Sequence, residues 1–226
     1  MPGEPLMLKP PRAERGSIPG PAGGLEALIE TPAAEALCEP RGVGAFAVVC
    51  HPHSLHGGTL DNKVVYTVAR ACGQLGAATI RFNFRGVGAS AGRYDQGRGE
   101  AADARAVIDF GRRRFPGAAL WLGGFSFGAA VAAGIAAEVR AARVVLVAPG
   151  ITVVEVAVPA AQCPWLIVQG DADDVVPPRA VLDWARALTA APGVPPPAVR
   201  LLAGAGHFFH GRLHDLRQAV LEFLSA

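Results

Sequence analysis

Short apolar runs alternate with stretches of helical periodicity along most of the chain. Runs typical of buried strands occur at Phe46–Cys50, Ala77–Phe84, Ala118–Gly123, Val144–Ala148, Pro164–Gln169 and Ala198–Leu202. Amphipathic spacing between and after these runs predicts helices from about residue 60 to Leu75, over Gly99–Phe115, Ala129–Val139, Pro177–Ala190 and Arg212–Leu224. Strands that alternate with helices predict an α/β fold, with a mostly parallel sheet covered by helices on both faces.

The N-terminal segment departs from this alternation. Ser17-Ile18 and Leu25–Glu30 flank the turn-rich segment Pro19–Gly24, which predicts a β-hairpin. Residues 1–14 are polar and rich in proline, and we expect them to form a mobile tail. The remaining residues, 15–226, fit a single domain. Either Thr59 or Asp61 is expected to cap the helix that ends near Leu75.

Composition and charge exclude several classes of protein. The formal net charge is only +2, which argues against a nucleic-acid partner, and the basic run Arg112–Arg114 fits the last turn of a helix. Residues 117–137 carry no charge, but this segment holds several glycines and a central serine, which favours a buried strand–turn–helix unit over a membrane span. We therefore expect no membrane association.

Cysteine usage and the first residues predict a cytoplasmic protein. Cys38, Cys50, Cys72 and Cys163 show no C-x-x-C spacing, so free buried thiols are expected rather than a disulfide framework. The charged, proline-rich beginning has no apolar segment typical of a signal peptide.

The most informative motif is Gly124-Phe125-Ser126-Phe127-Gly128. It follows a strand-like run and opens a helix-like run, so Ser126 is expected on a tight strand-to-helix turn. The flanking glycines remove side chains where the backbone is crowded. The hydroxyl of Ser126 would then stand at the sheet edge, beside helix N–H groups that can bind an oxyanion.

Two further motifs follow in the chain order serine, acid, histidine that is typical of this elbow. The strand Pro164–Gln169 ends in an acidic turn with Asp171, Asp173 and Asp174. The strand Ala198–Leu202 ends in a loop with His207. In a parallel sheet these ends lie at one edge, where ligands and chemistry collect. A serine with a histidine base and a carboxylate predicts nucleophilic acyl transfer.

With these motifs the sequence resembles the α/β-hydrolases. It is most similar to a group of small, lidless bacterial hydrolases related to dienelactone hydrolase and simple serine esterases. The resemblance covers about residues 17–225 and is strongest over His51–Lys63 and Arg81–Ser90. Many relatives have proline where this chain has Ser54. Dienelactone hydrolases proper use a cysteine where this chain has Ser126, so the likeness to them concerns fold rather than substrate.

The resemblance implies roles for individual residues. The Gly-Asp-x-Asp-x-x-Val-Pro pattern of related esterases matches Gly170–Pro177 and makes Asp173 the acid, with Asp171 and Asp174 as turn residues. His207 is then the base, and His210 is its rival. The backbone N–H groups of Phe127 and His53 would form the oxyanion hole. The connection Gly150–Cys163 is too short for a helical cap, so we expect an open site without a substantial cap domain.

Other readings use the same residues differently. His51, His53 and His56 have spacing that could bind a metal and would make the protein a metal-dependent hydrolase. A non-catalytic binding protein with this fold is a third class. Asn62, Asn83 and Arg85 could contact substrate, but side-chain-to-backbone bonds that fix loops are expected instead. Phe84, Phe125, Phe208 and Phe209 lie near the turns and could shape an acyl pocket, although core packing is the commoner fate of such aromatics.

The sequence as a whole predicts a serine hydrolase that cleaves an ester of a small molecule through an acyl-enzyme, without cofactor or metal. Thioesters and peptides could be cleaved by the same apparatus. A homodimer is left open.

Overall fold

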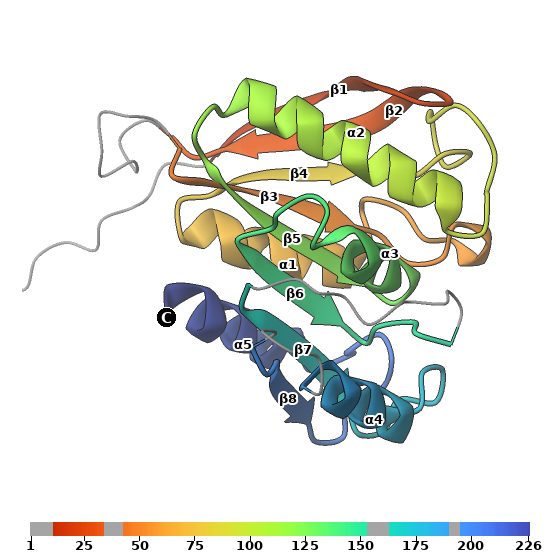
Figure 1. The fold of residues 1–226 in the computed structure, drawn as a ribbon, viewed down its shortest axis with the longest axis vertical. Helices are drawn as coiled ribbons and strands as arrows, with labels where there is room; N and C mark the ends of the chain where they lie inside the picture. Colours follow the sequence, from red (N-terminus) through yellow and green to blue (C-terminus); the bar gives the residue numbers. More distant parts are fainter. Residues whose placement is uncertain (1–10, 34–42, 153–162, 190–194) are drawn as a thin grey trace, which may run out of the picture.

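The computed structural model describes residues 11–33, 43–152, 163–189 and 195–226, and one eight-stranded sheet runs through them in the order β1-β2-β4-β3-β5-β6-β7-β8 (Figure 1). The strands are β1 (Arg12–Gly20), β2 (Gly23–Thr31), β3 (Ala45–Cys50), β4 (Ala78–Phe82), β5 (Ala119–Phe125), β6 (Arg143–Val147), β7 (Trp165–Gly170) and β8 (Ala198–Leu202). The helices are α1 (Lys63–Gln74), α2 (Arg98–Arg114), α3 (Phe127–Ile135), α4 (Pro178–Thr189) and α5 (Leu213–Ser225), with a short 3₁₀ turn η2 (Ser54–His56).

The parallel sheet expected from the sequence is confirmed. Strands β3 to β8 are parallel, whereas β1 and β2 form the predicted antiparallel hairpin and β2 pairs antiparallel with β4. Every residue of β3 and of β7 is buried, as continuous apolar runs in a sheet covered on both faces require. The carboxyl ends of β3 to β8 therefore lie at one edge, where the loops that follow them meet.

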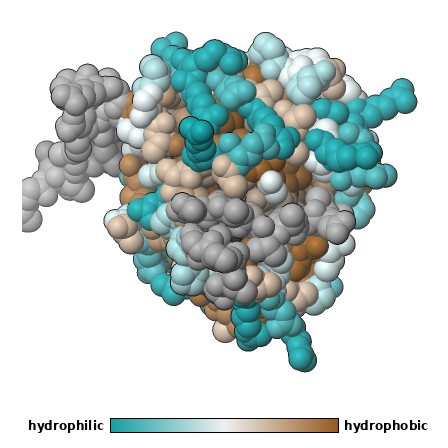
Figure 2. Space-filling view, viewed as in Figure 1, coloured by the Kyte–Doolittle hydropathy of each residue, from teal (hydrophilic) through white to brown (hydrophobic). Residues whose placement is uncertain are grey.

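Helices cover both faces of the sheet and bury two apolar cores. One core joins α2, α3 and α4 to the sheet, and the other joins α1 and α5 to its opposite face. Figure 1 shows this division, with α2, α3 and α4 in front of the strands and α1 and α5 behind them. On the front face, hydrophilic residues gather over α2 (Figure 2). Among the inward positions predicted for α2, Ala104, Val107 and Ile108 are fully buried.

The structure differs from the sequence prediction at several boundaries, among them those of α3, which spans Phe127–Ile135 and not Ala129–Val139. Strand β1 begins at Arg12, so residues 12–14 pair with β2 instead of belonging to a tail, while residues 1–10 lie outside the described residues. The cap of α1 is Asn62, whose side chain accepts hydrogen bonds from the N–H groups of Val64 and Val65; Thr59 and Asp61 were the wrong choice. Asn62 directly precedes the first helical residue, which is the position from which a side chain reaches these N–H groups.

Three of the four cysteines lie in described segments. Cys50, Cys72 and Cys163 are free and buried, as predicted, and burial raises the pKa of the Cys72 thiol to about 12. Cys38 lies outside the described residues, as do residues 153–162 of the connection in which a cap would be inserted. No helix in the described parts of the chain is long and apolar enough to cross a bilayer.

Candidate active site

Ser126 lies on the turn between β5 and α3, with a strained backbone. Its φ is 54° and its ψ is −119°, a conformation that side chains rarely allow. The flanking glycines make this turn possible. A Cβ on Gly124 would lie 2.4 Å from the carbonyl oxygen of Gly128, and one on Gly128 would lie 2.3 Å from that of His51. The turn therefore holds the Ser126 side chain at the carboxyl edge of the sheet.

His207 follows β8 and reaches Ser126 from another loop. Its Nε2 lies 3.1 Å from the Oγ of Ser126, and its side chain is almost entirely buried. The imidazole packs against the ring of Phe125, with ring centroids 4.9 Å apart. Gly170 lets the loop approach β7, because a Cβ there would lie 2.1 Å from the carbonyl oxygen of Ala205. The close packing of the two loops thus places the imidazole beside the serine.

Asp173 follows β7 and completes a chain of hydrogen bonds. Its Oδ2 accepts a hydrogen bond from His207 Nδ1 at 2.9 Å and another from Gln169 Nε2 at 2.9 Å. Its Oδ1 accepts from the N–H groups of Val175 (2.9 Å) and Val176 (2.8 Å). Burial alone would raise the pKa of the carboxyl group, but these bonds and the proximity of His207 hold that pKa below its ordinary value. The carboxylate is therefore ionised and fixed in position.

The competing residues of the sequence analysis lie elsewhere. Asp171 is exposed, and its Oδ1 accepts from Gly204 N at 2.6 Å, so it ties the loop after β7 to the loop after β8. Asp174 is exposed as well. His210 is exposed and stacks on Phe208 with centroids 6.0 Å apart. Within the described residues, it is Asp173 and His207 that the structure links to the serine.

The two residues predicted to supply oxyanion N–H groups are neighbours in space. Phe127 is the first residue of α3, where helix N–H groups have no partner within the helix. The ring of His53 lies 5.0 Å from that of Phe127. Gly150 also adjoins this point, since a Cβ there would lie 3.1 Å from Phe127 N. A side chain at position 150 would crowd the N–H group that is proposed to bind the oxyanion.

His51 has a structural function that sequence reasoning missed. Its Nε2 accepts a hydrogen bond from Phe84 N at 2.9 Å, so its Nδ1 carries the proton and donates to the carbonyl oxygen of Pro52 at 2.6 Å. Burial lowers the pKa of this imidazole to about 4. Because both ring nitrogens are engaged inside the protein, His51 cannot serve as the metal ligand that the spacing of histidines suggested.

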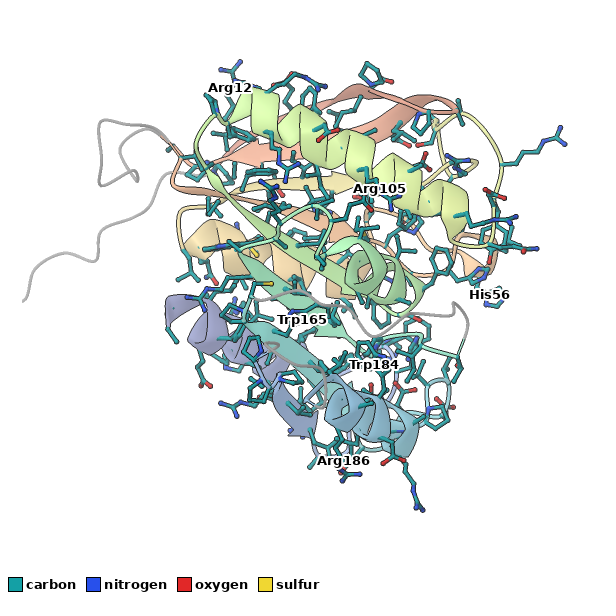
Figure 3. All side chains as sticks on the ribbon, viewed as in Figure 1. Arg12, His56, Arg105, Trp165, Trp184 and Arg186 are labelled. Atoms are coloured by element: carbon teal, nitrogen blue, oxygen red, sulfur yellow. The ribbon has the colours of Figure 1, made fainter. Side chains whose placement is uncertain are left out.

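Tyr94 is a second residue that the sequence analysis did not identify. Its hydroxyl lies 3.1 Å from His53 Nε2, while His53 Nδ1 accepts from Leu55 N at 3.3 Å. His56 stacks on His53 at 4.6 Å and, as Figure 3 shows, lies at the edge of the molecule toward which the strands point. Among the described residues no group of three or more histidine, cysteine, aspartate or glutamate side chains is arranged to hold a metal. No signal in the sequence relates Tyr94 to His53.

Asn83 fixes the backbone, as predicted, because its Oδ1 accepts from Leu60 N at 2.8 Å. For Arg85 the prediction of a bond to the backbone is wrong, since its side chain forms an ion pair with the fully buried Asp103 at 2.8 Å. The phenylalanines divide between two fates. Phe84, Phe125 and Phe209 are fully buried in the core, whereas Phe208 is 48% exposed beside His207.

Fold and site together have the features of a serine hydrolase of the α/β class: a strained serine, a histidine within bonding distance and a buried carboxylate behind it. Comparison with known proteins supports this class. The model of a family described as serine aminopeptidase, S33, matches residues 47–162. An uncharacterised protein of Rickettsia prowazekii is 31% identical over 186 residues, which are 79% of this chain and 77% of that protein.

Two solved structures are similar over nearly the whole chain. A lidless α/β serine hydrolase from Xanthomonas campestris is 38% identical, with a TM-score of 0.83, and the match covers 98% of this chain and 97% of that one. An α/β serine hydrolase homologue from Coxiella burnetii is 39% identical, with a TM-score of 0.77 and coverage of 97% and 99%. The chain belongs to the α/β-hydrolase superfamily, in the family of serine hydrolases that the S33 model describes.

Proposed function

We propose that this hydrolase cleaves carboxylic esters of small molecules through an acyl-enzyme formed on Ser126. The observation that carries this proposal is the chain of hydrogen bonds from Ser126 Oγ to His207 Nε2 (3.1 Å) and from His207 Nδ1 to Asp173 Oδ2 (2.9 Å). A serine hydroxyl is a weak nucleophile at neutral pH and needs such a base within reach. The same series of hydrogen bonds argues against a non-catalytic binding protein, because binding alone does not require an activated serine.

The geometry supports a definite sequence of proton transfers. Asp173 holds His207 with its proton on Nδ1, so the lone pair of Nε2 is available to the serine hydroxyl. As Ser126 Oγ attacks the ester carbonyl, Nε2 takes the hydroxyl proton, and Asp173 stabilises the resulting imidazolium. The N–H groups of Phe127 and His53 would bind the oxyanion. The imidazolium then gives its proton to the leaving alcohol.

The second half of the reaction uses the same groups in reverse. Water enters after the alcohol has left, and His207 Nε2 removes its proton while the oxygen attacks the acyl carbon. Collapse of the tetrahedral intermediate breaks the bond to Ser126 Oγ, which recovers its proton from the imidazolium. No step in this scheme requires a metal, and the engagement of both His51 nitrogens removes one member of the alternative histidine set.

The proposal is tested by turnover and by labelling of the serine. We expect the purified protein to hydrolyse p-nitrophenyl acetate and butyrate, and Ser126→Ala to lose about 10³-fold or more of this activity. Ser225→Ala removes an exposed hydroxyl on α5 and serves as the matched control, with full activity. A fluorophosphonate probe mapped by mass spectrometry should label Ser126 alone, and EDTA should leave turnover unchanged.

Parallel assays distinguish the acyl bonds that this apparatus could attack. A thioester and an aminoacyl p-nitroanilide are compared with the ester under the same conditions. A larger kcat/KM for either would replace the ester assignment while keeping the nucleophile. A folded protein that neither turns over these substrates nor takes the label would overturn the proposal itself.

A further inference from the structure

A pocket opens between the two loops that carry His53 and His207. It has a volume of about 240 Å³ and is lined on one side by Thr59, Asp61 and residues 62–64, where the loop after β3 enters α1. Phe208 and His210 line the other side. Both walls therefore continue segments that the proposed mechanism uses, yet none of the residues lining the pocket takes part in the proton transfers.

The pocket lining contains a lysine that has no acidic partner among the described residues. Its acidic residue, Asp61, pairs with Arg15 (3.1 Å) and Arg81 (3.6 Å), which also pair with Glu26 and Glu30. Lys63 is exposed and, within the described parts of the chain, forms no ion pair. It is also one of only two lysines, beside nineteen arginines, in the whole sequence. His210 likewise has no acidic partner among the described residues, so Lys63 and His210 are available to bind an anionic group.

The position of the pocket indicates which part of a substrate it would bind. Phe208 contributes an exposed aromatic face to the pocket and contacts His207, with ring centroids 5.1 Å apart. In the proposed mechanism His207 donates a proton to the leaving alcohol, so that alcohol must lie next to its imidazole. A pocket that begins at the neighbouring side chain is therefore on the alcohol side of the ester.

We propose that this pocket binds an anionic group on the alcohol part of the ester substrate. The apolar part of the alcohol packs against Phe208, and the negative charge lies near Lys63 and His210. This inference rests on the proposed function because it takes Ser126 as the nucleophile and His207 as the proton donor. It adds a substrate class: esters of alcohols or phenols that carry a carboxylate or a comparable anion.

The test uses a pair of acetate esters that differ in charge. The anionic ester is 3-acetoxybenzoate, and the neutral one is 3-acetoxyacetophenone, in which a methyl ketone replaces the carboxylate. The measured quantity is the ratio of their kcat/KM values, anionic over neutral. We expect Lys63→Met to lower this ratio roughly two- to fivefold at low salt, the range of a partly exposed ion pair. Added salt should lower the wild-type ratio in the same direction.

Two further variants separate local contact from net charge. Lys63→Arg keeps the charge at the pocket and should keep the ratio within about twofold of the wild type. Arg70→Met removes one positive charge from the same face of α1, about 10 Å further along the helix, and should leave the ratio unchanged. A ratio that is insensitive to Lys63→Met, or that falls equally in Arg70→Met, would overturn the proposal.

Binding to an inactive protein tests the pocket separately from the chemistry. In the Ser126→Ala background, calorimetric titration with 3-acetoxybenzoate should give a lower Kd than with the neutral ester, and Lys63→Met should remove this difference. Equal Kd values for the two esters would contradict the pocket assignment. If the wild-type protein hydrolyses neither ester while the difference in Kd persists, the proposed function fails and the anion site stands.

Discussion

Asp173 keeps its charge although its side chain is buried, because donors reach both of its oxygens. The backbone N–H groups of Val175 and Val176 hold one oxygen, and Gln169 shares the other with His207. A buried carboxylate with several donors is stabilised in its ionised form. These donors fix the orientation of the carboxylate, so the proton on His207 Nδ1 points toward it. The tautomer of the imidazole thus depends on this single carboxylate.

Replacing the carboxylate with an amide should therefore abolish most of the activity. In Asp173→Asn the amide NH₂ can face His207 Nδ1, which shifts the proton of the imidazole to Nε2 and leaves no base for Ser126. We expect kcat for p-nitrophenyl butyrate to fall about 10⁴-fold, with the folded state retained by circular dichroism. Asp171→Asn is the matched control and should cost less than about tenfold. A larger loss of kcat in Asp171→Asn than in Asp173→Asn would show that Asp171, and not Asp173, is the acid that orients His207.

Tyr94 is a positioning residue if His53 supplies an oxyanion N–H group. Tyr94→Phe removes only the hydroxyl that contacts His53 Nε2 at 3.1 Å and keeps the ring near Phe127. We expect kcat to fall roughly two- to tenfold, the worth of one hydrogen bond, with KM nearly unchanged because the oxyanion exists only in the transition state. The other tyrosine, Tyr66, is exposed on α1, and Tyr66→Phe should leave both constants unchanged. A change in KM alone would assign Tyr94 to substrate binding instead.

At the scale of elements, the ends of neighbouring strands are tied together by side chains. His51, at the end of β3, accepts a hydrogen bond from Phe84 N just beyond β4. Asp171, directly after β7, accepts a hydrogen bond from Gly204 N beyond β8. These bonds fix the loops that carry His53 and His207, so the spacing of the site depends on contacts outside it.

The tie made by His51 should appear in the pH dependence of stability. Its pKa is lowered from 6.5 to about 4, so between these values the unfolded chain binds a proton that the folded protein does not. The stabilisation is fully present above pH 6.5 and is lost as the pH falls toward 4, by about 3 kcal/mol. The free energy of unfolding, measured by urea denaturation at several pH values in this range, should depend less on pH for His51→Gln than for the wild type.

A matched histidine variant makes this comparison specific. His214→Gln removes an exposed imidazole on α5 and should keep the slope of the wild-type curve. Identical slopes for His51→Gln and the wild type between pH 4 and 6.5 would show that the His51 imidazole is not held neutral. A lower stability of His51→Gln at pH 7 is expected in addition, because two hydrogen bonds are lost.

The sequence predicted elements better than contacts between them. Within the described residues, periodicity and turn residues located each β-strand and α-helix, and β8 was predicted with its observed bounds, because these signals are local. The cap of α1 was missed by one residue, since Thr59, Asp61 and Asn62 are all good capping residues. Asp173 was singled out by a family pattern, and its distance to His207 depends on how the loops after β7 and β8 pack. The contact between Tyr94 and His53 spans 41 positions and leaves no local trace.

At the scale of the whole molecule, the site lies at the edge of the sheet where the parallel strands end. The connection between β6 and β7, residues 148–164, is far shorter than a folded domain, and the similar hydrolase from Xanthomonas campestris is described as lidless. Enzymes with a lid must open it before substrate can enter, and such opening can limit the rate. If the active site has no lid, the rate of hydrolysis should depend on the concentration of dissolved substrate and not on the presence of a lipid surface.

This difference can be measured with an ester of limited solubility. We expect the rate of tributyrin hydrolysis, plotted against tributyrin concentration, to follow a single hyperbola without a break at the solubility limit. Droplets should not raise the rate, because an active site without a cap has nothing that their surface could open. A lipase with a known interfacial response, assayed in parallel, shows that the emulsion is adequate. An abrupt rise in rate once droplets form would mean that a covering segment moves at the interface, and the open site inferred from the short β6–β7 connection would then be wrong.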